Sequence, residues 1–267
     1  MRVHLLHIVL ILLFLGCKEK RETTPFLTHK KVRMAPPMIE VDSILFHKEA
    51  RVLLKMDLEG STITYGLGET TETNGTTYED PISIDESASL WARAEHPDFL
   101  PSETTSLALY RIKRNTTGMA IAIAPSPHPN YPGEGAQILS DMRRGDQNFR
   151  KGKAWLGFQS GTVQLQLRWA SPIHISKISI GFLADHSAWI FAPKKISVFS
   201  AKQKLGEQTV DSPTEHQSSQ LGMAQIPIPE STYQELQLTI ESLEAIPSWH
   251  QGKGTLPWLF LDEILIE

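Results

Sequence analysis

The sequence has very little cysteine, no hydrophobic run long enough to span a membrane and no extended run of charge of one sign. Cys17 is the sole cysteine among 267 residues, so an internal disulfide is excluded and the folded cores must be stabilised by packing. The apolar run from Leu5 to Leu15 is shorter than the roughly 20 residues that a membrane-spanning helix needs. The formal net charge is −4, and the sequence has no basic patch of the kind that binds nucleic acid. We therefore expect no nucleic-acid partner.

The N-terminal segment has the pattern of a leader followed by a tether. A short apolar run after Arg2 is typical of a secretory signal peptide. The run ends at Leu13-Phe-Leu-Gly-Cys17, which resembles a bacterial lipobox, whose cysteine is lipidated and becomes the first mature residue. We predict a signal peptide at residues 1–16, lipidation of Cys17 and a charged tether at residues 17–36. This predicts a lipid-anchored protein of the bacterial cell envelope, at the outer membrane and facing the periplasm or the surface; the alternative is an ordinary secretory signal with a chance cysteine.

Hydrophobic residues after the tether alternate with polar ones, and no apolar stripe of helical period runs far enough to predict a long helix. Val52 to Leu58 and Val163 to Trp169 both alternate in this way, which is typical of half-buried strands. Short strands separated by turn residues indicate an all-β fold class. We predict a small immunoglobulin-like sandwich at residues 37–112 and a jelly-roll β-sandwich at residues 137–267.

Residues 113–136 are predicted to form a proline-rich junction between the two sandwiches. Ala120 to Ala124 has the length of one short strand, and the segment from Pro125 to Pro132 is stiffened by closely spaced prolines. Ordering such a restricted segment costs little entropy, so we expect it to pack along the second sandwich. The alternative is a plain linker.

The first predicted sandwich carries several short motifs in a fixed order. They are Gly60-Ser-Thr-Ile-Thr-Tyr65, Thr77-Tyr-Glu-Asp-Pro-Ile82, Leu90-Trp-Ala-Arg-Ala94 and Pro101-Ser102. Together they resemble the chitobiase/β-hexosaminidase C-terminal-type repeat. The hairpin at Tyr65-Gly-Leu-Gly-Glu69 has diverged from the family pattern. The resemblance implies a spacer or accessory sandwich without catalytic residues.

The second predicted sandwich also carries motifs in one order. They are Leu139-Ser-Asp141, Gly145, Asn148-Phe149, Trp155-Leu-Gly-Phe158, Trp189-Ile-Phe-Ala-Pro193, Pro247-Ser-Trp-His250 and Trp258-Leu-Phe-Leu-Asp-Glu-Ile264. In this order they resemble the discoidin (coagulation factor 5/8 type C)-like domain that ends many bacterial β-hexosaminidases. The chain departs from the family pattern at Met142, where the family carries glycine, and at Ser200-Ala-Lys-Gln203, which lacks an Asp-Gly pair. The resemblance implies a discoidin-like jelly-roll sandwich.

The same resemblance implies one structural calcium ion near the first motif. Its ligands here would be Asp141 or Asp146, together with Glu263 from the last strand. Calcium takes about six to eight oxygen ligands, several of them from the backbone. The alternative is that Glu263 forms a salt bridge with Arg143 or Arg144.

Asp262-Glu263 is similar in residue type to the Asp-Glu pair that performs catalysis in hexosaminidases. Neighbouring residues of a strand point to opposite faces, so these carboxylates are not expected to converge on one glycosidic oxygen. The sequence also lacks a nucleophile elbow, a His-Glu-x-x-His motif and a phosphate-binding glycine loop. We therefore predict that the protein is not an enzyme.

Aromatic and polar residues in two loops are the candidate carbohydrate-binding groups. An aromatic ring packs against the C–H face of a sugar, while neighbouring polar side chains bind its hydroxyl groups. The alternative is that Trp155, Trp189 and Trp258 fill the core and that Trp249 and His250 lock a loop through hydrogen bonds. In that case His186 is an ordinary polar loop residue, and Arg143 and Arg144 are a solvated charge pair. The candidates are Asp185, His186, Trp189, Trp249, His250 and Lys253 in the loops, with Arg143 from the first motif.

These observations predict a non-catalytic surface lipoprotein that binds carbohydrate, related to the tail of β-hexosaminidases. Its expected partners are a glycan or glycosylated surface and, through the lipid on Cys17, a membrane. Two alternatives stay open: a structural or protein-interaction module, and an accessory subunit of a separately encoded glycoside hydrolase. Exposed aromatic rings at the loop tips would favour carbohydrate binding over a purely structural role.

Overall fold

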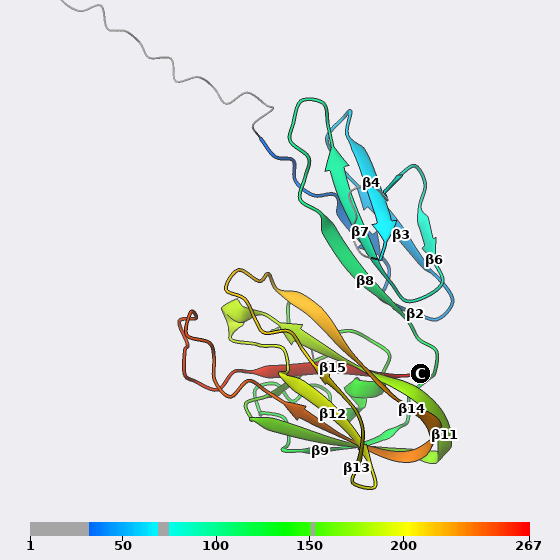
Figure 1. Cartoon of the computed structure of the whole chain (residues 1–267), viewed down its shortest axis with the longest axis vertical. Coiled ribbons are helices and arrows are strands. Elements are labelled where there is room, and N and C mark those ends of the chain that lie inside the picture. The colour runs from blue at the N-terminus through cyan, green and yellow to red at the C-terminus, as the bar shows by residue number, and fades with distance from the viewer. Residues whose placement is uncertain (1–31, 69–74, 151–152) are drawn as a thin grey trace, which may run out of the picture.

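A computed structural model of the chain describes residues 32–68, 75–150 and 153–267. These residues form two β-sandwiches, one after the other along the chain, which confirms the predicted all-β fold class (Figure 1). Cys17, the signal peptide and most of the tether lie outside the described residues. Within the described ranges, no helix has both the length and the apolar character needed to cross a membrane.

The first sandwich packs a three-stranded sheet against a five-stranded sheet. Inward-facing residues such as Val52, Leu90 and Leu109 are fully buried between the two sheets. The three-stranded sheet has the order β1 (Met38–Val41), β3 (Ala50–Lys55) and β6 (Ile82–Ile84); the five-stranded sheet has the order β2 (Leu45–Phe46), β8 (Thr105–Arg111), β7 (Ala88–Glu95), β4 (Thr62–Leu67) and β5 (Thr76–Thr77).

Strand β3 follows the predicted alternation but ends three residues before Leu58. Its residues alternate between buried and exposed from Ala50 onward. The chain then turns: the Ser61 backbone N–H donates to the Leu58 carbonyl at 3.2 Å, and Gly60 adopts a φ of 80°. Glycine adopts this left-handed conformation readily, so the chain can turn here. The strand therefore ends at Lys55, although the alternation of hydrophobic residues continues to Leu58.

The second sandwich is built from seven strands that belong to one continuous hydrogen-bonded sheet. Two of them, β11 (Thr162–Ala184) and β14 (Gln220–Glu241), are very long and pair antiparallel along most of their length. Register shifts near Arg168 and Ile175 interrupt this pairing, and both strands curve there (Figure 1). The other strands are β9 (Ala120–Ala124), β10 (Leu156–Phe158), β12 (Lys195–Ser200), β13 (Gln203–Thr209) and β15 (Leu259–Ile266).

The proline-rich segment runs along the second sandwich. Strand β9 pairs antiparallel with β11. Further on, the His128 N–H donates to the Gly157 carbonyl at 2.8 Å, and the Gly157 N–H donates to the Tyr131 carbonyl at 2.9 Å. These bonds hold residues 128–131 beside β10 and fix where Tyr131 projects.

A small apolar cluster, here called the inter-module contact, joins the two sandwiches. Three residues of this cluster are buried: Leu45 in the first sandwich, Ile112 just after its last strand, and Leu265 in β15. Two polar contacts lie nearby: Lys113 pairs with Glu267 at 3.1 Å, and the Arg114 side chain donates to the His174 carbonyl at 3.0 Å. Three partly buried residues complete the cluster: Tyr110, Met142 and Met223.

Candidate functional site

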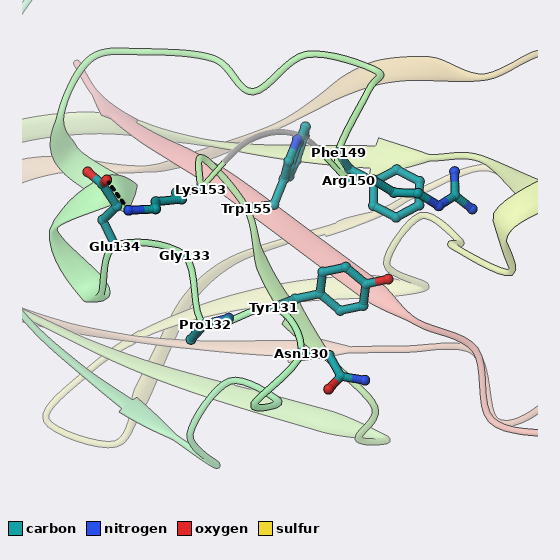
Figure 2. A pocket seen from close by; sticks show the side chains of 9 residues that line it. All are labelled: Asn130, Tyr131, Pro132, Gly133, Glu134, Phe149, Arg150, Lys153 and Trp155. Carbon is teal, nitrogen blue, oxygen red and sulfur yellow. Dashed lines mark ion pairs between the residues drawn. The ribbon is translucent and has the colours of Figure 1, made fainter.

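A groove of about 480 Å³ lies where the proline-rich segment faces the loop before β10 (Figure 2). One wall comes from residues 130–134 and the other from the chain around Phe149 and Trp155. The groove combines aromatic rings with amide, carboxylate and cationic side chains. Its lining residues are Asn130, Tyr131, Pro132, Gly133, Glu134, Phe149, Arg150, Lys153 and Trp155.

An aromatic cluster beneath the groove orients Tyr131. The Tyr131 ring lies 4.7 Å from the Phe260 ring, 5.1 Å from the Trp258 ring and 5.9 Å from the Phe149 ring, measured between centroids. Phe149 also packs edge-on against Phe260 at 5.2 Å. Such tilted and edge-to-face contacts favour a fixed ring orientation. The groove therefore has a preformed aromatic wall.

Polar groups stand at both ends of the groove. The guanidinium of Arg150 lies 4.5 Å above the Phe149 ring, while Asn130 is exposed at the opposite wall. Lys153 and Glu134 form an exposed ion pair at 3.5 Å. Rings flanked by donors and acceptors are the chemistry with which proteins bind sugars and similar polyols.

Sequence reasoning missed this groove. Tyr131 and Asn130 lie in the proline-rich segment, which the sequence predicts to be a junction packed along the second sandwich and to which it assigns no binding role. An aromatic residue within a stiff segment beside a sandwich is a signal that could have identified this wall. Arg150 directly follows the Asn148-Phe149 motif, but the sequence does not indicate that this loop faces Tyr131.

Five of the predicted binding residues do come together, in what we call the loop-tip cluster: Asp185, His186, Trp189, Trp249 and His250. The His250 ring lies 5.8 Å from both the Trp189 ring and the Trp249 ring. His250 Nε2 lies 2.9 Å from the His186 carbonyl, and its Nδ1 accepts the Gly252 N–H at 3.0 Å. Because Nδ1 is an acceptor, Nε2 carries the proton and donates to His186. The His250 ring therefore ties the two loops together.

Several of these side chains are engaged within the cluster. His186 is 7% exposed and stacks on Phe191 at 4.5 Å; burial and the neighbouring His250 lower the pKa of His186. Asp185 caps the short 3₁₀ helix η4 (His186–Ala188) by accepting bonds from Ser187 and Ala188.

Trp189 is the most exposed aromatic residue of the cluster, at 36%. Its backbone adopts a φ of 65° at the end of η4. Gly252 lies directly beneath the ring, where a side chain would crowd it. Lys253 is exposed beside this position. The cluster thus presents one indole ring and one ammonium group, and its role in carbohydrate binding stays a prediction.

Arg143 does not join the loop-tip cluster. It lies in the loop after the 3₁₀ helix η3 (Ala136–Ser140), where its backbone N–H donates to Asp141 Oδ1 and to Glu263 Oε2, both at 2.9 Å. The backbone of Arg143 is therefore bound to β15 and to its own loop. Its side chain is exposed, and among the described residues no hydrogen bond joins it to the loop-tip cluster.

The acidic residues of this region are bound by N–H groups. Glu263 is fully buried and accepts from the backbone of Arg143 and Ile264, and burial raises its pKa to about 8. Asp262 accepts from Arg144 Nε at 2.6 Å and from the Gly145 N–H at 2.8 Å. The sequence left open a salt bridge from Glu263 to Arg143 or Arg144. In the structure, Glu263 instead accepts the backbone N–H of Arg143, and Arg144 pairs with Asp262.

This donor set does not fit the calcium ion that the resemblance implies. Both oxygens of Glu263 accept N–H groups, as does Asp141 Oδ1, and a guanidinium lies against the adjacent Asp262. Calcium needs about six to eight oxygen ligands. Asp146 is exposed, and its carbonyl accepts the Trp155 indole N–H. Across the described ranges, no group of three or more His, Cys, Asp or Glu residues is arranged to hold a metal ion.

Asp262 and Glu263 also do not form an acid–base pair at the groove. Both are buried within β15, and neither lines the groove. Asp262 is held by a guanidinium, whereas Glu263 is held by backbone N–H groups. The two carboxylates therefore have different partners, although residues 143–145 of one loop supply groups to both.

No family model matches the chain, and no curated protein matches it in sequence. Among solved structures, the SusE-like protein BT2857 is similar at 11% identity and a TM-score of 0.38, over 85% of this chain and 95% of that one. CpGH89CBM32-5 from Clostridium perfringens, solved with GalNAc-β-1,3-galactose, is similar at 14% identity and a TM-score of 0.36, over 57% of this chain and 97% of that one. The lectin domain of lectinolysin, solved with Lewis B antigen, is similar at 10% identity and a TM-score of 0.38, over 58% of this chain and 97% of that one. Likenesses of this degree define no family for this chain.

Proposed function

We propose that this chain is a non-catalytic surface protein that binds carbohydrate through its second sandwich. The groove beside Tyr131 carries the proposal, because the ring of Tyr131 is fixed there by neighbouring aromatic rings and lies among the amide of Asn130 and the guanidinium of Arg150. A sugar binds such a surface by packing its C–H face on a ring while its hydroxyls bind polar side chains. The volume, about 480 Å³, lies within the range of small-ligand sites.

The position of the protein in the cell is part of this proposal. A lipid on Cys17 would hold the chain at the outer membrane of a bacterial envelope, with residues 17–36 as the tether. The first sandwich then carries the second one away from the membrane, in the manner of the tail of a β-hexosaminidase. In this arrangement the groove meets glycans near the cell surface and can serve a separately encoded glycoside hydrolase.

Replacing Tyr131 with alanine is expected to weaken glycan binding about tenfold, because the sugar loses its ring platform. The measurement is binding of the purified protein to an array of neutral and acidic oligosaccharides, followed by calorimetry with the best glycan. Tyr233→Ala is the matched control, since Tyr233 lies in β14 and does not line the groove.

The outcomes separate the two candidate sites. Binding that survives Tyr131→Ala but is lost in Trp189→Ala assigns the glycan to the loop-tip cluster. Loss in both variants, with native unfolding temperatures, indicates one ligand that spans both surfaces. Failure of the native protein to bind any arrayed glycan contradicts the proposed function.

A further inference from the structure

Met142 occupies an unusual backbone conformation at the inter-module contact. Its φ is 61°, in the left-handed region that non-glycine residues seldom adopt. The Met142 side chain packs with the apolar cluster formed by Leu45, Ile112 and Leu265. Strained backbone conformations persist where surrounding contacts determine them. The first sandwich therefore contributes, through Leu45 and Ile112, to the cluster against which Met142 packs.

The residues after Met142 are fastened to β15. The Arg143 N–H donates to Glu263 at 2.9 Å, the Arg144 side chain pairs with Asp262 at 2.6 Å, and the Gly145 N–H donates to Asp262 at 2.8 Å. Arg144 also donates to the Gly222 carbonyl at 2.8 Å. Three successive residues thus bind the two buried carboxylates of one strand.

The same loop supports a wall of the groove. Gly145 lies against the Trp155 ring so closely that a Cβ atom there would overlap it. The Trp155 indole N–H donates to the Asp146 carbonyl at 3.0 Å, and Trp155 lines the groove. A continuous series of contacts therefore leads from the first sandwich, through Met142 and Gly145, to Trp155.

We propose that docking of the first sandwich is coupled to the groove through residues 142–146. Docking holds Met142 in its left-handed conformation, which keeps Gly145 and Asp146 in place against Trp155. Release of the contact allows Met142 to relax and loosens this wall. The first sandwich then positions the binding site in addition to spacing it from the membrane. The inference rests on the proposed function only in treating the groove as the ligand site.

The test follows the Trp155 indole N–H by hydrogen exchange, measured by NMR on the full chain. Ile112→Ala removes apolar contact from the side of the first sandwich, and we expect Trp155 exchange to become about 2- to 30-fold faster. Leu53→Ala is the control, because Leu53 is 36% exposed on the same sandwich and lies outside the contact. Small-angle scattering reports whether the two sandwiches separate.

Met142→Gly supplies the second variant. Glycine adopts the same φ without strain and removes the side chain, so Ile112→Ala should no longer affect Trp155 in this background. An equal effect of Ile112→Ala in both backgrounds overturns the proposed route. Unchanged Trp155 exchange in Ile112→Ala, with or without separation of the sandwiches, overturns the coupling.

This readout needs no glycan, so it distinguishes the coupling from the proposed function. Binding is then measured with two probes, chitotriose and a galactose-terminated trisaccharide. For a probe that binds the native protein, Ile112→Ala should weaken binding, and the fold-change should be similar to the fold-change in Trp155 exchange. Absence of binding to both probes, together with accelerated Trp155 exchange, supports the coupling and counts against the groove as a site for these sugars.

Discussion

Replacing Arg144 with methionine should lower the free energy of unfolding by about 3–5 kcal/mol. The Arg144 and Asp262 side chains are 4% and 0% exposed, and their ion pair measures 2.6 Å. Methionine fills much of the same space but leaves the Asp262 carboxylate buried without its cation. Burial raises the pKa of Asp262, and Arg144 opposes this effect, so the variant must bury an uncompensated charge or bind a proton. Urea unfolding followed by tryptophan fluorescence measures the loss.

A double variant and an exposed pair test the cause of this loss. Arg144→Met combined with Asp262→Asn should recover most of the stability, because the neutral amide can still accept the Gly145 N–H. Arg168→Met is the control: Arg168 and Glu235 are 65% and 42% exposed, and their loss should cost less than about 1 kcal/mol. Equal losses in Arg144→Met and Arg168→Met would show that burial of the pair has no special importance.

The strands could be predicted because burial follows the period-2 pattern of the sequence. From Val163 to Leu167 in β11, apolar residues are buried and the intervening glutamines are exposed. The same relation holds in β3, although its end depends on the turn at Gly60. Alternation determines which side of a strand faces the core. It carries little information about how far a strand runs through a bend, which explains why β11 is longer than the alternating segment.

Contacts between loops were harder to predict because they join residues that are distant in sequence. Asp185 and Trp249 were both assigned to loop tips, and these loops do meet through His186 and His250. Arg144 and Asp262 are 118 residues apart, and only the packing of the loop onto β15 brings them together. The groove likewise depends on the path of the proline-rich segment along β10, which short motifs do not specify.

Stability should fall as the pH rises from about 5 to 7.5, and Glu263→Gln should reduce that fall by the Glu263 contribution. Burial raises the pKa of Glu263 from 4.5 to about 8, so the folded state keeps a proton that the unfolded chain releases. This contribution is fully present below about pH 4.5 and is lost as the pH rises through about 8. The expected slope is about 1.4 kcal/mol per pH unit within this window.

Other groups shape the same curve, and the variants separate them. Burial also raises the pKa of Asp141 and of Asp262, which gives the same sign, whereas the lowered pKa of His186 favours folding above about pH 6.5 and opposes it below. The Glu263 contribution is therefore the difference between the pH profiles of native protein and Glu263→Gln, measured by urea unfolding. Glu103→Gln, at an exposed carboxylate, should leave the profile unchanged. Parallel profiles for the native protein and Glu263→Gln would mean that the Glu263 carboxyl ionises in the folded state much as it does in the unfolded chain.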